Sequence, residues 1–215
     1  ITQVLNRRTL VQLNYSRAIT NGYTNDPYKY LSIVDPISGQ TLDYLYEGRP
    51  DSRNTNVLYG KVVYHLPEDV LNASVRLFND DWGISSTTFD LHYRYELAGA
   101  ISLQPHLRLY NQSAANFYRH SLVNGSDVNI AAQTVAVANA SADMRLAEMQ
   151  TTTWGLKVGI PLGKGKQQNE LSLRIKQIVQ TGDSKPSDAI GVQKDYDMYP
   201  DLEATVVQLN YSFTF

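Results

Sequence analysis

Apolar and polar positions alternate through most of the chain, most clearly at its C-terminal end. Between Thr205 and Phe215 the odd positions are almost all apolar and the even positions are mostly polar. A period of two over this length predicts an extended strand with one apolar and one polar face. The six residues V-Q-L-N-Y-S of Val207–Ser212 also occur at Val11–Ser16, so the chain carries two copies of one strand design.

The alternation predicts eight strands, preceded by a short lead-in over Ile1–Arg7. The strands cover Thr9–Thr20, Asn54–Leu66, Leu71–Asp80, Thr88–Leu97, Ile101–Gln112, Thr153–Leu162, Asn169–Gln180 and Thr205–Phe215. Short turns are expected at Pro67–Asp69, Ala98–Ala100 and Gly163–Gly165, and long loops at Asn21–Ser52, His120–Gln150 and Thr181–Leu202. Pro105 predicts a bulge or a missing ladder bond within its strand. A short helix is expected within Asp143–Met149.

Two all-β architectures fit this pattern: a transmembrane barrel and a soluble sandwich or jelly roll. Short turns at one end with long loops at the other are typical of outer-membrane barrels. Charged residues on one face of almost every strand favour the same architecture. The strands also reach the ~9–11 residues that a tilted spanning strand needs. We therefore predict an antiparallel transmembrane β-barrel, with residues 1–215 forming a single domain.

The amino-acid composition excludes several other classes of protein. No run approaches the ~18 apolar residues of a spanning helix, and the mean hydropathy is −0.34. The net charge of −2 and a pI near 6.1 argue against a nucleic-acid partner. The absence of cysteine excludes disulfides and thiolate chemistry. Fifteen tyrosines suit an interface at which the ring is buried and the hydroxyl stays in water.

The strand faces opposite the apolar rows carry the candidate functional residues. They are expected to line the lumen and comprise Lys61, Arg76, Asp90, His92, Arg94, Glu96, His106, Arg108, Lys157, Glu170, Arg174 and Lys176. A register slip of one residue would turn these charges toward lipid, at ~2–4 kcal/mol per midplane Arg or Lys. One interpretation is a structurally packed, salt-bridged lumen. The other is an electropositive pore or pocket that favours anionic solutes.

Two loop features indicate chemistry more weakly. The third long loop is acidic and could hold Ca²⁺ or Mg²⁺, or bridge to lipopolysaccharide, although solvated surface charge also accounts for it. Its carboxylates are Asp183, Asp188, Asp195, Asp197 and Asp201. Asp80 and Asp81 with His120 suggest acid and histidine catalysis at a barrel mouth, but no nucleophile or spacing rule connects them. No metalloprotease, P-loop or dinucleotide motif is present, so we expect neither an enzyme nor a cofactor.

Several strings together resemble an uncharacterised family of Gram-negative outer-membrane proteins, known only as a domain of unknown function. They are N-R-R-T-L-V-Q-L-N-Y-S at Asn6–Ser16, D-P-Y-K at Asp26–Lys29, Y-L-Y-E-G-R-P-D-S-R at Tyr44–Arg53, D-D-W-G-I at Asp80–Ile84, L-Q-P-H-L-R at Leu103–Arg108, Q-S-A-A-N-F-Y-R at Gln112–Arg119 and Y-P-D-L at Tyr199–Leu202. The resemblance implies a bacterial outer-membrane location, in contact with the bilayer and with lipopolysaccharide. It also implies further strands upstream, so that this chain would be the C-terminal part of a larger barrel lacking its N-terminal portion.

The terminal aromatic residue resembles the C-terminal signal of outer-membrane barrels, which implies that Phe215 is read by the assembly machinery of the outer membrane. The resulting functional hypothesis is a porin-like channel or conduit with an electropositive lumen. The alternative is a structural barrel that anchors or sheathes an envelope complex through a periplasmic or surface protein partner. A barrel-mouth hydrolase is the remote third reading.

Overall fold

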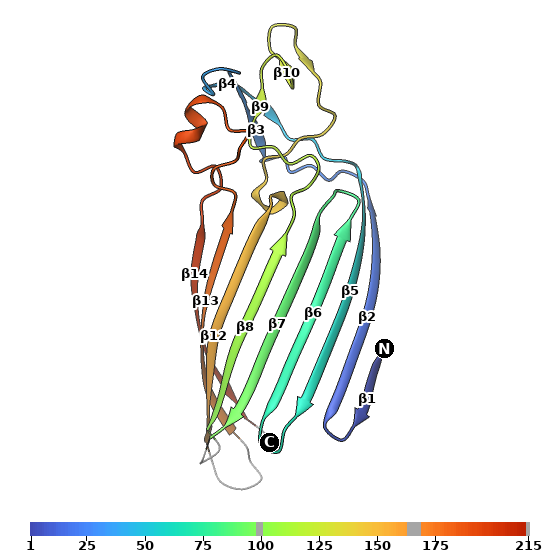
Figure 1. Ribbon diagram of the computed structural model, residues 1–215, viewed down its shortest axis with the longest axis vertical. Helices are drawn as coiled ribbons and strands as arrows, with labels where there is room; N and C mark the ends of the chain where they lie inside the picture. The colour runs from blue at the N-terminus through green and yellow to red at the C-terminus, as the bar shows by residue number, and fades with distance from the viewer. Residues whose placement is uncertain (98–100, 163–168, 214–215) are drawn as a thin grey trace.

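The computed structural model describes residues 1–97, 101–162 and 169–213. Its main element is an antiparallel sheet of nine strands (Figure 1). In sheet order these are β1 (Thr2–Asn6), β2 (Thr9–Asn21), β5 (Ser52–His65), β6 (Val70–Asp80), β7 (Ser85–Glu96), β8 (Ser102–Gln112), β12 (Met149–Leu162), β13 (Asn169–Gly182) and β14 (Leu202–Ser212). The all-β, antiparallel fold predicted from the alternation is therefore confirmed.

The register of this sheet joins apolar positions to apolar positions from strand to strand. Val62 of β5 opposes Ala73 of β6, which opposes Leu91 of β7. The row continues through Leu107 of β8 to Trp154 of β12. Because side chains alternate between the faces, a slip of one residue would move a strand's apolar set to the other face. The apolar pattern thus specifies the pairing.

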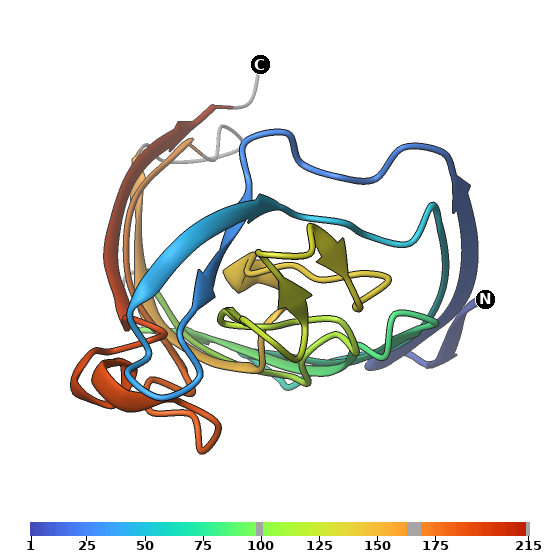
Figure 2. The same ribbon diagram turned by 90° about the horizontal axis from the view of Figure 1, so that it is seen from above.

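The sheet is strongly curved, and its two edges lie apart at the ends of the arc (Figure 2). Within the described residues, β1 and β14 each pair with a single neighbour. The nine described strands therefore form an open, curved sheet.

Strand β1 is the one strand of this sheet that the alternation missed. The segment predicted as a lead-in forms a hairpin with β2, in which Ile1 and Leu13 exchange backbone hydrogen bonds. Its five residues are too short to display a period of two, so the prediction of eight strands was one too few.

Pro105 has the effect expected from its missing N–H. The pairing of β7 with β8 keeps one register along its length, but it is interrupted where Tyr93 and Arg94 face Pro105 and Gln104. The pairing of β8 with β12 on the other side is continuous through Pro105. Of the two outcomes predicted, a bulge and a missing ladder bond, the structure shows the second.

At one end of the sheet three connections are long, as predicted, and consist of residues 22–51, 113–148 and 183–201, whereas the β6–β7 connection at the same end has only residues 81–84. The β5–β6 turn closes with a hydrogen bond from the Leu66 N–H to the Asp69 carbonyl. The turns predicted at Ala98–Ala100 and Gly163–Gly165, like Phe215, lie outside the described residues.

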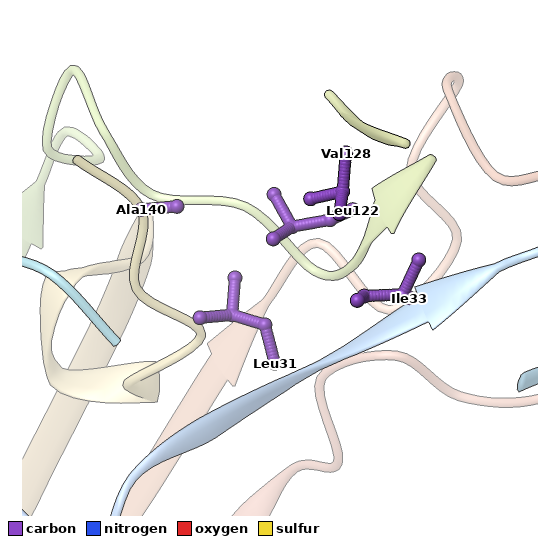
Figure 3. Packing of buried hydrophobic residues seen from close by; sticks show 5 residues of the cluster. All are labelled: Leu31, Ile33, Leu122, Val128 and Ala140. Carbon is purple, nitrogen blue, oxygen red and sulfur yellow. The ribbon is translucent and has the colours of Figure 1, made fainter. Parts of the chain in front are cut away.

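The two longest connections, residues 22–51 and 113–148, fold together into a small unit that we call the cap. It contains a mixed sheet of β3 (Tyr30–Val34), β4 (Thr41–Tyr46) and β9 (Leu122–Val123), and a hairpin of β10 (Val128–Asn129) and β11 (Thr134–Val135). A cluster of buried apolar side chains joins both connections (Figure 3): Leu31, Ile33, Leu122, Val128 and Ala140. The long loops predicted here thus contain short strands that the alternation did not reveal, and β3 and β9 are held together by pairing and packing between residues far apart in the sequence.

Two further apolar clusters attach the cap and the last loop to the sheet. In one, Trp82 of the β6–β7 connection packs edge-on against Phe117, with ring centroids 5.2 Å apart. In the other, Tyr199 covers Met149 at the start of β12. The short helix expected within Asp143–Met149 is present as the 3₁₀ turn η1 (Met144–Leu146), and the last loop forms a second, η2 (Gly191–Asp195). Among the described residues, no helix has the length and apolarity required to cross a membrane.

Candidate functional site: a basic pocket on the concave face

The polar face of the sheet is its concave face. Thr88, Ser102, Thr153 and Ser172 on this face are only 3–7 % exposed, whereas Leu209 on the apolar face is 71 % exposed. Side chains converge on the inside of a curved sheet and diverge on its outside, which accounts for the difference. All the ionisable residues predicted on one face lie on this concave face: Lys61, Arg76, Asp90, His92, Arg94, Glu96, His106, Arg108, Lys157, Glu170, Arg174 and Lys176.

Glycines on the concave side of β12 leave room for its neighbours. Gly155 lies between His106 of β8 and Lys176 of β13 in the register. A Cβ atom at Gly155 would come within 2.6 Å of the Ile175 carbonyl oxygen and 2.8 Å of the Lys176 Cγ atom. Glycine within a strand often marks close approach or a tight bend of a curved sheet. Here it admits the long Lys176 side chain.

One carboxylate and two imidazoles form a compact cluster on β7 and β8. Asp90 Oδ1 lies 2.9 Å from His92 Nε2, and Asp90 Oδ2 lies 3.2 Å from His106 Nε2. The two rings are directly opposed in the register and stack, with centroids 4.0 Å apart and planes inclined by 6°. His106 is 8 % exposed. Both oxygens of Asp90 are therefore engaged by histidine.

This cluster engages Asp90 in place of the cation opposite it. The register places Arg108 directly opposite Asp90. Opposite charges in such a position commonly pair. In the described residues, however, the close contacts of Asp90 are with the two imidazoles, and Arg108 is in no ion pair. The guanidinium of Arg108 is left exposed on the concave face.

The other two acids predicted on this face are also engaged, at the end of the sheet with the short turns. Lys157 Nζ lies 2.8 Å from Glu170 Oε1, and an Arg94 guanidinium nitrogen lies 3.5 Å from Glu96 and 3.8 Å from Glu170. Five cations of the concave face are then in no ion pair with another described residue: Lys61, Arg76, Arg108, Arg174 and Lys176. The face as a whole is electropositive.

Three of these cations surround a pocket of about 640 Å³, halfway along the strands. Its lining consists of Asp90, His92, His106, Arg108, Tyr110, Thr151, Thr153, Arg174, Lys176 and Ile178. We call this the basic pocket. Of its residues, Tyr110, Thr151, Thr153 and Ile178 were absent from the predicted site because they are uncharged. Their alternate positions on β8, β12 and β13 were the signal available.

The Asp90, His92 and His106 cluster is the one group of described side chains whose ligand atoms lie close enough together, within 4.8 Å, to suggest a metal site. An imidazole lone pair lies in the plane of its ring. Two parallel rings 4.0 Å apart cannot both direct a lone pair at one ion without rotating. The three cations of the basic pocket would also repel a metal cation. The geometry thus favours an anion in this pocket over a metal.

The acidic loop does not form such a group. Asp183 and Asp188 line a separate cavity of about 230 Å³ together with His120 and Tyr118. Asp197 pairs with Lys185 at 3.3 Å. No three of the carboxylates proposed as cation ligands converge among the described residues; they are Asp183, Asp188, Asp195, Asp197 and Asp201.

The residues suggested for acid and histidine catalysis have separate partners. Asp80 pairs with Arg53 at 2.6 Å, and Asp81 accepts a hydrogen bond from the Asn54 N–H. His120 lies against Tyr118, whose hydroxyl is 3.3 Å from His120 Nδ1.

Burial sets the protonation of the residues in this cavity near the acidic loop. It lowers the pKa of His120, although Asp188 and Asp183 oppose this effect. It raises the pKa of Tyr118 to about 12, with contributions from Tyr199 and Asp143. Both side chains are therefore held neutral near pH 7.

A buried ionic cluster, which the sequence did not suggest, joins the two halves of the cap. Arg49 Nη2 donates to Glu47 Oε2 at 3.0 Å and to Asp143 Oδ2 at 2.8 Å. Arg145 Nε also donates to Asp143, at 2.9 Å. Burial alone would raise the pKa of Asp143, but the hydrogen bonds from Arg145 and Arg49 outweigh it and lower the pKa to about 2. This cluster holds the two halves of the cap together.

Comparison with known proteins identifies the family. The profile of a family described as protein of unknown function (DUF3570) matches residues 1–213. No match was found among the curated proteins or among the solved structures. The matched region includes every strand of the curved sheet and the whole cap. The chain therefore belongs to the DUF3570 family.

Proposed function

We propose that the curved sheet is part of the wall of an outer-membrane β-barrel, with its apolar face in the hydrocarbon. Three observations support this proposal. An apolar row crosses the register from β5 to β12, and many side chains of the apolar face are exposed. Eight of the strands have 11–14 residues, enough to cross a bilayer. A large exposed apolar surface on a protein otherwise needs a partner to cover it.

The proposed barrel requires closure of the two free edges. Unpaired backbone groups cost several kcal/mol each in hydrocarbon, so a spanning sheet must have no open edge. β1 and β14 lie at the ends of the arc (Figure 2). Further strands that pair with both would complete the cylinder, as expected for the C-terminal part of a larger barrel. In this arrangement the bilayer, lipopolysaccharide and the outer-membrane assembly machinery are the partners.

The proposed activity is a channel or conduit that favours anions. The observation that carries this proposal is the basic pocket, in which Arg108, Arg174 and Lys176 are in no ion pair among the described residues while Asp90 is engaged by histidines. Rings of arginine and lysine bias passage toward anions. The concave face would form the lumen, and a solute would meet these cations halfway across.

Planar-bilayer recordings of the full-length protein test this function. In a potassium chloride gradient, the reversal potential should indicate chloride preference. Arg108→Gln should shift it toward cation preference, whereas Lys194→Gln, which removes a cation from η2 in the last loop, should leave it unchanged. Cation preference in the wild type, or no conductance at all, would refute the proposal.

One observation favours a second candidate, a structural barrel that anchors an envelope partner. The cap lies over one end of the curved sheet (Figure 2) and has its own apolar core and buried ionic cluster. A cap held this firmly would close the passage and present a folded surface to a partner. Stoichiometric co-purification of a periplasmic or surface protein, together with the absence of conductance, would support this second function.

A further inference from the structure

We infer that the basic pocket is a saturable binding site for small oxyanions that carry two or more negative charges. The inference deepens the proposed function, since it rests on the concave face being a lumen and names the class of solute that stops there.

The histidines act as positioning residues for Asp90. They hold both of its oxygens at 2.9 and 3.2 Å, and the carboxylate makes no ion pair with Arg108 across the strand pair. Opposite charges directly across an antiparallel pair commonly pair. In this pocket the acid is instead engaged by the histidines of β7 and β8, and the cations are left available for a solute.

The three cations are spread around the pocket and do not meet at one point. Arg174 and Lys176 are two residues apart on the same face of β13, a separation of about 7 Å along the strand. Arg108 lies on β8, with β12 between, so it is about 10 Å away across the sheet. A single chloride could be neutralised by one of them. A solute with two separated anionic groups would engage cations on both sides of β12.

The chemistry of the lining indicates oxyanions. Arginine presents a planar fork of donors that matches carboxylate and phosphate oxygens, and two of the three cations are arginines. The hydroxyls of Thr151 and Thr153 line the pocket between the cations, and Tyr110 and Ile178 supply apolar surface at one side. A volume of about 640 Å³ falls within the usual range for small-molecule sites, and exceeds what one chloride ion fills.

Equilibrium binding of pyrophosphate to the full-length protein in lipid nanodiscs tests this site. Pyrophosphate carries two anionic phosphate groups and can be followed directly by ³¹P NMR. We expect saturable binding, measured as broadening of the ³¹P NMR line of pyrophosphate. The double variant Arg174→Gln/Lys176→Gln should weaken binding at least about tenfold, because charge-assisted hydrogen bonds are lost. Lys61→Gln removes a cation from the same face outside the pocket and should change binding less than twofold.

A second measurement separates this inference from the proposed function. Chloride conductance without any pyrophosphate binding would overturn the oxyanion site and leave the channel intact. Pyrophosphate binding without conductance would support the site while refuting the channel. Saturable binding of Zn²⁺ that His92→Gln abolishes, with no binding of pyrophosphate, would show that the cluster is a metal site and overturn the inference. Unchanged strand content by circular dichroism would confirm that each variant is folded.

Discussion

Asp143, the buried carboxylate of the cap, is expected to contribute a definite free energy to the stability of the cap. Asp143 accepts hydrogen bonds from Arg49 and Arg145, and its pKa falls from 3.8 to about 2 as a result. An asparagine at this position approximates the protonated carboxyl. Folding therefore favours the charged over the protonated carboxyl of Asp143 by about 2 kcal/mol, since each pKa unit corresponds to about 1.4 kcal/mol. The loss should stay below the ~3–5 kcal/mol of a broken buried pair, because Arg49 retains Glu47.

Amide hydrogen exchange measures this loss directly. Gly48 and Ala140 exchange backbone hydrogen bonds at 3.0 and 2.9 Å, and so bridge the two halves of the cap. At neutral pH, Asp143→Asn should lower the protection of both amides about 30-fold, the equivalent of about 2 kcal/mol. The exposed Asp201→Asn is the matched control and should change neither.

The pH dependence has a defined sign. The folded-state pKa of Asp143 lies below its value in the unfolded chain, so its contribution is fully present above pH 3.8 and disappears as the pH falls through about 2. The wild type and Asp143→Asn should therefore show convergent cap protection at the acidic end of this window. Equal protection of the two proteins at pH 7 would refute the assignment of this cluster as the fastening of the cap.

Three further predictions follow from individual side chains. Gly155→Ala should strain the pairing of β12 with β13, displace the Lys176 side chain and weaken pyrophosphate binding in the nanodisc assay, because its Cβ would lie within 2.6 Å of the Ile175 carbonyl oxygen and 2.8 Å of the Lys176 Cγ atom. Unchanged binding would mean that Lys176 does not need this space. Asp188→Asn should lower the pKa of His120 further, since the Asp188 charge opposes the effect of burial; a proton NMR titration of the imidazole checks this. Leu156→Arg should destabilise the protein in bilayers by up to ~2–4 kcal/mol, the cost of an arginine at the bilayer midplane. Urea titration in lipid vesicles measures this loss, and stability equal to the wild type would contradict a lipid-facing Leu156.

The long strands were predictable from sequence because each contains enough residues to display its own period. The predicted Thr9–Thr20 corresponds to β2 over Thr9–Asn21, and Leu71–Asp80 to β6 over Val70–Asp80. The cap was not predictable in this way. Its strands have two to six residues, and they are stabilised by contacts such as Leu31 with Leu122 that only the folded chain creates.

The charges of the candidate site were predictable, but their pairing was not. Alternation alone places Asp90, His92 and Arg94 on the face that carries Arg108. Whether Asp90 pairs with Arg108 or with histidine depends on the register of β7 against β8 and on side-chain rotamers. The cluster of Arg49 and Asp143 in the cap joins residues 94 positions apart and leaves no local pattern.

The central claim is that alternate side chains of the curved sheet point into hydrocarbon and into an enclosed polar interior. Because the chain contains no cysteine, single cysteines can be spin-labelled one at a time along β7 and β8 in lipid bilayers. We predict high collision rates with oxygen at Leu91, Leu107 and Leu109, and high collision rates with a water-soluble nickel complex at His92 and Arg108. Equal nickel accessibility at both sets, or the reverse pattern, would contradict the account.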